Sequence, residues 1–227
     1  MRKPQKSVTR TPAAAGKAKK SGTVTRAQQK ESTRAAILQA ALDIFAEHGF
    51  EGGSTRDIAA HAGVHHALIK YHYHSKDQLW RAAVSFLFER QAIELSFEPA
   101  PGALATREGR REHAREIMRR FVQYCARHPE HARLMVQESV RDSKRLRWAA
   151  DTFISRTSIA AHDFVRLLKH EQMVPDVSET ALVYIIVGAA QLFYTLAPEV
   201  RRVWKVDPSK QSAIDAHMEA MMAVFVR

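Results

Sequence analysis

The side chains best suited to bind a charged ligand lie close together between residues 54 and 76. Four histidines stand at positions 65, 66, 72 and 74, beside Lys70 and Lys76. Imidazole is a common metal ligand, but these histidines point to diverging faces of a helix and no acid or cysteine completes a tetrahedral set. We therefore expect no metal and no cofactor, and interpret the imidazoles and ammoniums as hydrogen-bond donors to phosphates or base edges.

Two short helical patterns, joined by Ala62-Gly63-Val64, would position these donors. Ser54 or Thr55 can cap the first pattern, and the second runs from about residue 64 to residue 73. A pair of helices joined by a short turn containing glycine is how proteins place one helix in the major groove of DNA while the other braces it across the backbone. The stretch 54–73 is therefore predicted to be a helix-turn-helix motif.

The second helix of this motif has two distinct sides when it is wound at 100° per residue. The inward side is expected to hold Val64, Leu68, Ile69 and His72. The outward side is expected to hold His66, Ala67, Lys70 and His74. This outward stripe is the candidate surface for contact with bases.

Further helices are predicted on either side of the motif. The ordered chain is expected to begin near residue 31, where Ser32 or Thr33 can cap a helix that Glu47-His48-Gly49 ends. Ser75 and Gln78 have the spacing of a capping box, so another helix is expected from residue 76 to about residue 95. Lys76 would then stand at a helix N-terminus, where a phosphate can bind both its ammonium and free backbone amides.

The net charge of +11 is concentrated at the N-terminus. Residues 1–30 carry nine basic side chains and no acidic one, whereas the rest of the 227-residue chain is nearly neutral. This segment lacks apolar periodicity, so we expect a disordered basic arm. Contact with DNA phosphates is the favoured use of the arm; the alternatives are simple solubility and attachment to an anionic membrane, for which it lacks large apolar side chains.

The composition fits a protein with a sizeable core, since 45% of the residues are hydrophobic. The single cysteine, Cys125, excludes an internal disulfide and a cysteine-based metal cluster within the chain. It is interpreted as a small buried hydrophobe. No apolar stretch typical of a secretory signal follows the basic start, so we expect the protein in the cytoplasm.

Beyond residue 95 the pattern remains helical. A break is expected at 97–102, followed by helices near 107–128, 129–142, 144–171, 177–197 and 208–226. No segment alternates as strands do. The predicted class is all-α, with a three-helix N-terminal helix-turn-helix domain joined by a long helix to a larger helical domain.

The segment 181–197, ALVYIIVGAAQLFYTLA, contains only two polar residues. It falls just short of the roughly 20 residues that span a bilayer, and a helix that is apolar nearly all round is normally buried. We therefore expect no membrane span, and a four-helix interface between two chains in which this helix pairs with the last one. The side chains assigned to the dimer interface are Tyr184, Val187, Gln191, Met218, Met221, Met222 and Phe225.

A ligand cavity is expected among the middle helices, where aromatic and polar side chains recur. Its candidate lining residues are Phe121, Tyr124, Glu138, Trp148, His162 and Tyr194. Core packing or surface exposure is the favoured interpretation for each of them, because aromatic residues at helical spacing are usually core. A ligand there would act by favouring a dimer conformation whose recognition helices no longer match the DNA site.

The run from Thr33 to Leu79 resembles the DNA-binding domain of the tetracycline-repressor (TetR) family of one-component transcription regulators. The resemblance rests on Ile37, Ala41, Phe45, Gly49-Phe50, Ile58-Ala59, Ala62-Gly63-Val64, Tyr71-His72-Tyr73 and Ser75-Lys76. These features occur in order over about 47 residues, and the remaining two thirds of the chain match the family only in layout.

The resemblance implies which residues touch DNA. Phosphate contacts are implied for Thr55, Lys70, Tyr71 and Lys76, with a phosphate or guanine contact for Arg56. Contacts in the major groove are implied for His66 and Ala67, beside His65 and His74. His72 and Tyr73 would instead pack the module together.

The chain departs from the family pattern at two positions. His65 stands where serine or threonine commonly caps the recognition helix, and Lys70 stands where tyrosine is common. Both changes add basic character, which suggests a stronger contact with the phosphate backbone. The change at His65 removes the usual capping side chain.

These expectations divide the chain into a basic arm (1–30), a helix-turn-helix DNA-binding domain (31–91) and a helical ligand-binding and dimerisation domain (92–227). They predict a ligand-responsive transcription regulator, a repressor in preference to an activator, that binds an inverted-repeat operator as a homodimer and is released by a small-molecule effector. The alternatives are a sequence-independent nucleic-acid-binding protein that uses the arm, and an all-α enzyme. The enzyme lacks support, because no glycine-rich phosphate loop, Gly-x-Ser-x-Gly or His-Glu-x-x-His motif is present.

Overall fold

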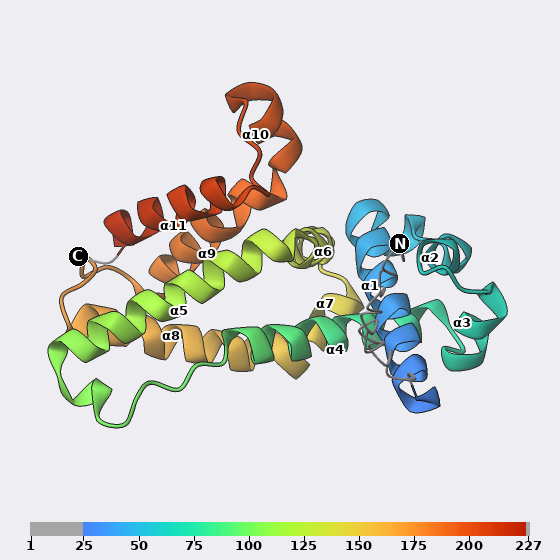
Figure 1. The fold of residues 1–227 in the computed structure, drawn as a ribbon, viewed down its shortest axis with the longest axis horizontal. Helices are drawn as coiled ribbons and strands as arrows, with labels where there is room; N and C mark the ends of the chain where they lie inside the picture. The colour runs from blue at the N-terminus through green and yellow to red at the C-terminus, as the bar shows by residue number, and fades with distance from the viewer. Residues whose placement is uncertain (1–24, 226–227) are drawn as a thin grey trace, which may run out of the picture.

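The computed structural model describes residues 25–225, and every regular element in that range is helical (Figure 1). The all-α prediction is confirmed. The N-terminal helices are α1 (Arg26–Gly52), α2 (Thr55–His61), α3 (His66–His72) and α4 (Lys76–Leu95). The others are η1 (Ala103–Ala105), α5 (Arg107–Arg127), α6 (Pro129–Val140), α7 (Lys144–Ala149), the π-helical turn η2 (Ala150–Ile154), α8 (Ser155–His170), α9 (Glu179–Thr195), α10 (Ala197–Trp204) and α11 (Gln211–Phe225).

Helix α1 begins at Arg26, seven or eight residues before the start that a cap at Ser32 or Thr33 would give. Its N-cap is Thr25, whose hydroxyl accepts a hydrogen bond from the Gln28 amide at 3.2 Å while the Gln28 side chain accepts one from the Thr25 amide at 2.9 Å. Apolar periodicity could not locate this start, because no described side chain before Ile37 is buried. Residues 26–30 of the predicted arm therefore belong to α1, and residues 1–24 lie outside the described range.

The first hydrophobic core joins α1, α2, α3 and α4 into one module. Its largest fully buried side chains include Phe45, Ile58, Ile69, Leu79 and Trp80. Burying a side chain of this size contributes about 1.5 to 3 kcal/mol to stability. The same core extends to Leu134 of α6 and Ala149 of α7, so the module rests directly on the rest of the chain.

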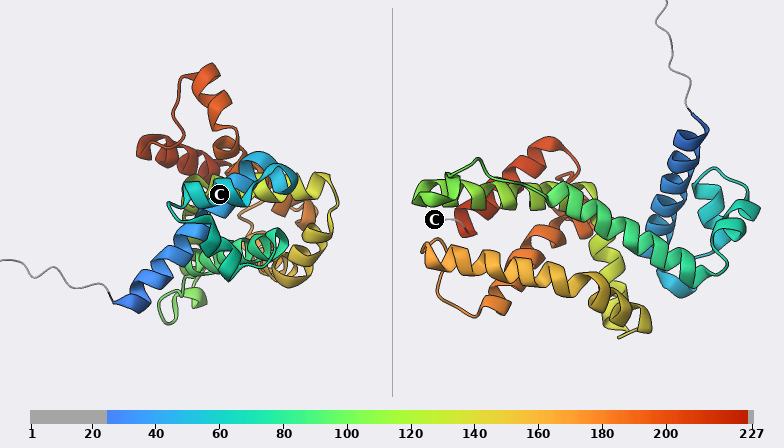
Figure 2. Two further views of the ribbon diagram at one scale, coloured as in Figure 1. Left: turned by 90° about the vertical axis from the view of Figure 1, so that its right-hand side faces the viewer. Right: turned by 90° about the horizontal axis from the view of Figure 1, so that it is seen from below.

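Helix α4 connects the module to a larger helical body, as Figures 1 and 2 show. It begins at Ser75, whose hydroxyl accepts from the Gln78 amide at 3.1 Å, and its bounds match the prediction. Gln78 itself accepts from the His74 amide at 3.2 Å, one residue before the partner that a capping box would give it.

The body has a second core, built from α5, α8, α9, α11 and the loop after α8. The predicted helix 144–171 is continuous but contains the π-helical turn η2. The predicted helix 177–197 ends earlier, at Thr195, because the backbone turns at Leu196 and Pro198 occupies the first turn of a new helix, α10. Periodicity missed α10, and the last helix begins at Gln211 instead of residue 208.

No single helix within residues 25–225 is long and apolar enough to cross a membrane. Helices α9 and α10 meet that test only as a pair, and they are bent by 71° relative to each other.

Candidate nucleic-acid interface

The turn between α2 and α3 has the geometry of a tight helix-turn-helix. Gly63 has φ of +67°, a left-handed conformation that favours glycine. The turn is closed by hydrogen bonds from the Gly63 amide to the Ala60 carbonyl at 3.1 Å and from the Val64 amide to the Ala59 carbonyl at 3.0 Å. At the other end of α2, the Ser54 hydroxyl accepts from the Arg56 amide at 3.1 Å, as the predicted cap requires.

His65 itself is the N-cap of α3. Its Nδ1 atom accepts a hydrogen bond from the Ala67 amide at 3.3 Å, so an imidazole nitrogen takes the place of the usual hydroxyl oxygen. This interaction requires the His65 tautomer in which Nδ1 carries no proton.

The inward side of α3 matches the prediction except at His72. Ile69 is buried in the first core, and Val64, Leu68 and Tyr73 pack against it. The expected packing role of His72 was wrong: its side chain is exposed and has ring contacts with its two tyrosine neighbours. The reason is that α3 ends at His72 and Tyr73 adopts an extended conformation, which turns the Tyr73 ring inward in its place.

The outward side of α3 presents polar and basic side chains to solvent. Ala67 and Lys70 are exposed on α3, and Tyr71 is 76% exposed. His74 is exposed too, but it lies beyond the end of α3 and not on the predicted helical stripe. Arg56, at the start of α2, is exposed as well. These five residues form what we call the basic face of the module. Among the described residues, no group of three histidine, cysteine, aspartate or glutamate side chains is placed to hold a metal ion.

Two of the residues predicted to contact DNA, Thr55 and His66, form a hydrogen bond with each other. The Thr55 hydroxyl lies 3.0 Å from Nε2 of His66, and both side chains are half-buried. This contact ties the start of α2 to the start of α3. Because Nδ1 of His66 is not used in it, the imidazole can still interact with a partner outside the module.

Lys76 is also held by the protein. Its ammonium donates to the Glu51 carbonyl at 3.1 Å and lies 4.7 Å from the centre of the Phe50 ring. The side chain is half-buried, so it fixes the end of α1 to the start of α4. A phosphate contact from Lys76 would have to share the ammonium with these groups.

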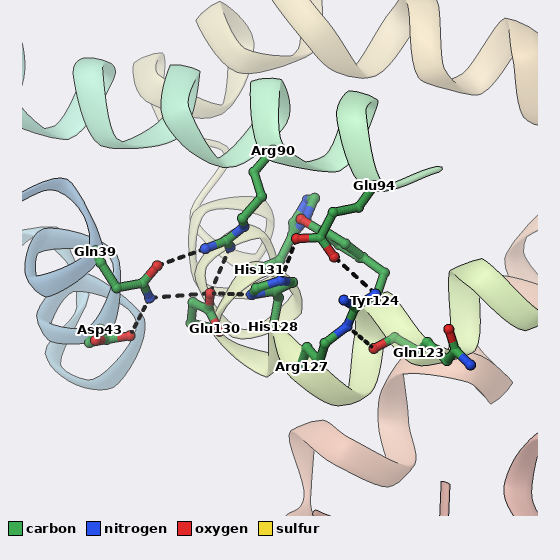
Figure 3. A network of polar contacts seen from close by, with 10 residues as sticks. All are labelled: Gln39, Asp43, Arg90, Glu94, Gln123, Tyr124, Arg127, His128, Glu130 and His131. Atoms are coloured by element: carbon green, nitrogen blue, oxygen red, sulfur yellow. Dashed lines mark hydrogen bonds and ion pairs between the residues drawn. The ribbon is translucent and has the colours of Figure 1, made fainter. Parts of the chain in front are cut away.

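A buried polar junction lies where the module meets the body, and Figure 3 shows its members. Arg90 of α4 donates to the Gln39 side chain of α1 at 2.7 Å and to the Glu130 carboxylate of α6 at 2.7 Å. Gln39 in turn donates to Asp43 at 3.0 Å, and its amide nitrogen lies 3.4 Å from Glu130. The junction thus connects α1, α4 and α6, and no pattern in the sequence indicated it.

The histidines beside this junction have different partners. His128 lies 2.9 Å from Glu94 through Nε2 and 3.5 Å from Glu130 through Nδ1. His131 is buried, and its Nδ1 lies 2.8 Å from the Tyr124 hydroxyl. Burial lowers the pKa of His131 to about 3.

The pKa of Glu130 is set by opposing effects. Burial raises it, but the hydrogen bond with His128 and the charge of Arg90 outweigh burial, so the pKa falls to about 2. Glu130 is therefore an ionised group inside the protein, and it depends on the basic partners around it.

The six predicted ligand residues do not surround one cavity. Trp148 packs with the module core, 6.0 Å from Trp80, and Glu138 bonds to Arg145 at 3.2 Å and to Ser143. His162 lies on the surface of the body, 3.1 Å from Glu179. The remaining three belong to the second core: Phe121, Tyr124 and Tyr194.

One small crevice in the body includes a predicted ligand residue. It is lined by Tyr124, Cys125, His128, His131, Ala132 and Gln191. The space between these side chains is too narrow for a water molecule. It adjoins the polar junction, because His128 lines the crevice and lies 3.5 Å from Glu130.

The predicted dimer residues differ in how accessible they are. Tyr184 is exposed, and Val187 and Gln191 are half-buried. Met221 is buried in the second core of its own subunit, so it is not free to contact another chain. The other predicted interface residues of α11 are partly buried and pack against the second core: Met218, Met222 and Phe225.

The geometry defines a class of protein, in which a helix-turn-helix module with an exposed basic face is mounted on a larger helical body. Comparisons with known proteins agree with this class. Residues 37–83 match the family model described as bacterial regulatory proteins, tetR family.

Curated relatives match parts of the chain. A stretch of 58 residues is 50% identical to the HTH-type transcriptional repressor Rv3405c of Mycobacterium tuberculosis, covering 26% of this chain and 31% of that protein. A stretch of 123 residues is 32% identical to the HTH-type transcriptional repressor NicS of Pseudomonas putida, covering 54% of this chain and 55% of NicS. The chain thus spans about a third of one curated relative and about half of the other.

Solved structures share the fold over most of the chain. The structure of AibR in complex with isovaleryl coenzyme A and operator DNA gives a TM-score of 0.63 at 15% identity, covering 85% of this chain and 98% of AibR. HlyIIR, a hemolysin II transcriptional regulator, gives 0.56 at 18% identity, covering 87% of this chain and 99% of HlyIIR. Residues 37–83 thus match the DNA-binding domain of the tetR family of bacterial regulatory proteins, and the solved structures share the fold over most of the chain.

Proposed function

We propose that the protein is a ligand-responsive repressor of transcription that acts in the cytoplasm, binds an inverted-repeat operator as a homodimer and leaves it when a small-molecule effector binds. The observation that carries this proposal is the basic face, where Lys70 and Tyr71 are exposed on α3, with His74 just beyond its end and Arg56 at the start of α2. The names of Rv3405c and NicS, both transcriptional repressors, support it.

The module would meet DNA through the basic face. Lys70, Tyr71 and Arg56 would contact phosphates on either side of the groove, because their polar groups are exposed and not needed for folding. Ala67 would approach base edges, where a methyl side chain suits contact with a thymine methyl group. His66 would donate to a base acceptor while Thr55 fixes its ring.

The response to an effector would pass through the polar junction. Its Arg90 joins the helix that carries the module to Glu130 on α6, and the narrow crevice adjoins Glu130 through His128. A small molecule that opened this crevice would move α6 and with it the position of the module. The structure of AibR in complex with isovaleryl coenzyme A and operator DNA supports a response to a small molecule in a protein of this fold.

The homodimer would form through the apolar outer side of α9. Tyr184, Ile185 and Leu192 are exposed there, at helical spacing around Gly188. An exposed apolar strip of this kind marks an interaction surface, and the two-fold symmetry of a dimer would present two copies of α3 to an inverted repeat. This strip passes beside Val187 and Gln191, which the sequence analysis had assigned to the interface.

Selection of bound sequences from a random DNA pool tests the proposal against its alternatives. We expect an inverted repeat to be enriched. A packaging protein that uses the basic arm would enrich no sequence and would lose most of its affinity when residues 1–24 are deleted.

Lys70→Ala should weaken binding to all DNA sequences alike. Removing one phosphate contact lowers the slope of log K against log salt concentration by about one unit, so a homodimer, in which two such contacts disappear, should show a slope lower by about two. Titration of operator and random DNA at several salt concentrations measures this slope. Lys210→Ala, at an exposed position remote from the module, is the matched control and should leave it unchanged.

His66→Ala should relax the preference for particular bases by about 1 to 3 kcal/mol. Binding to a set of operators with single base changes measures the effect. Thr55→Val removes the partner of the imidazole without removing the ring, and should give a smaller loss at the same base positions. Equal losses on operator and random DNA for His66→Ala would assign His66 to the backbone contacts.

A further inference from the structure

Helix α10 stands away from the rest of the body. Figure 1 shows it projecting beyond α9 and α11, and the turned view on the left of Figure 2 shows the same. Its inner side is anchored by Ala197 and Val200, which are buried. Its outer end carries Val203 and Trp204, which are 61% and 72% exposed. A tryptophan and a valine at this exposure form an apolar tip on a projecting element.

An open cleft of about 480 Å³ lies between α10 and α11. Its lining is almost entirely apolar and comprises Phe193, Val200, Trp204, Val206, Ala213, Ala216 and His217. Trp204 stands at its mouth, because it lines the cleft and is also largely exposed. A small apolar ligand in the cleft would leave the outer side of Val203 in water, so a larger partner is needed to cover the whole tip.

The charges on the two sides of the cleft are opposite in sign. The segment 197–206 carries Arg201, Arg202 and Lys205 against a single acid. Arg201 is paired with Asp207 at 3.0 Å, so Arg202 and Lys205 are the cations left for a partner. Helix α11 carries Asp215 and Glu219 and no lysine or arginine. In a two-fold dimer, each α10 can lie against the partner's α11, which places opposite charges together twice. The apolar tip is also continuous along the chain with the exposed Leu192 and Leu196 at the end of α9.

We propose that the segment 197–206 is a dimerisation arm: Val203 and Trp204 pack against α11 of a second copy of this chain, whose side chains close the cleft. The inference rests on the homodimer of the proposed function and deepens it. The arm extends the interface beyond the α9 strip and would supply its central aromatic anchor, the kind of residue that dominates binding energy at interfaces.

Cysteine labelling tests the arm directly. The native Cys125 is buried, which raises its thiol pKa, so an introduced thiol can be followed alone. In Val203→Cys, we expect maleimide labelling to be at least about 10-fold slower at concentrations where the chain is dimeric than where it is monomeric. Val140→Cys is the matched control, since Val140 is 82% exposed on α6 and should label at one rate throughout.

Sedimentation of the same samples measures their oligomeric state, which distinguishes failure of the arm from failure of the homodimer. A dimer in which position 203 labels as fast as position 140 overturns the arm and leaves the homodimer intact. A chain that is monomeric at every concentration overturns both. Slow labelling of the monomer would mean that α10 folds onto its own α11, and protection only by phosphatidylserine vesicles would assign the tip to a membrane surface; each of these results overturns the arm.

Trp204→Ala gives an independent measure. It should raise the dimer dissociation constant by at least about 30-fold, the loss typical of a tryptophan hot spot. Arg202→Glu should also weaken the dimer, and Glu219→Lys in the same chain should restore part of the affinity. No change with Trp204→Ala in a chain whose helical content is intact would contradict the proposal.

Discussion

Arg90→Met should lower the free energy of unfolding by about 3 to 5 kcal/mol, the cost of removing one partner from a buried ion pair. The side chains of Arg90 and Glu130 are only 14% and 10% exposed, and their charged atoms lie 2.7 Å apart. Without the guanidinium, the Glu130 carboxylate stays buried with weaker compensation, and Gln39 loses its donor. Chemical denaturation followed by circular dichroism measures the change.

Two controls identify the junction as the cause. The double variant Arg90→Met, Glu130→Gln removes the uncompensated charge, so it should be more stable than Arg90→Met alone. Arg147→Met breaks the exposed pair with Asp142, whose side chains are 57% and 78% exposed, and should cost no more than about 1 kcal/mol. An Arg90→Met variant with a free energy of unfolding within about 1 kcal/mol of the parent would show that the junction does not hold the module in place.

The elements that local chemistry controls were predictable from sequence. Ser54, Gly63 and Ser75 each satisfy a backbone requirement within three residues, so the motif and the start of α4 could be placed. The outward stripe followed from helical geometry alone. The predicted inward side failed at His72 because α3 ends there, whereas helical periodicity applies only while the helix continues.

The polar junction could not be predicted, because its members are distant in the sequence. Gln39 and Glu130 are 91 positions apart, and only the packing of α1 against α6 brings them together. For the same reason, the sequence could not show that the predicted ligand residues lie apart from one another. Periodicity indicated that Trp148 and Tyr194 face inward, but it could not show that they enter two different cores.

The free energy of unfolding should depend strongly on pH through His131. Because burial lowers the pKa of His131 from its ordinary 6.5 to about 3, the unfolded chain takes up a proton at this residue before the folded protein does. The resulting stability is fully present above pH 6.5 and is lost as the pH falls toward 3. When the pH is lowered from 7 to 5, protonation of His131 in the unfolded chain should reduce the free energy of unfolding by about 2 kcal/mol.

A comparison with His131→Gln isolates this contribution. Glutamine can keep a hydrogen bond with the Tyr124 hydroxyl but does not titrate, so the variant should lose about 2 kcal/mol less than the parent between pH 7 and pH 5. Burial also lowers the pKa values of His113 and His217, and their contributions remain in both proteins and cancel in the difference. Glu130 does not interfere in this window, because with a folded pKa of about 2 and an ordinary value of 4.5 it stays largely ionised in both states. Parallel curves for parent and variant would mean that the His131 imidazole binds its proton equally well in the folded protein, and therefore that water reaches it beside Tyr124.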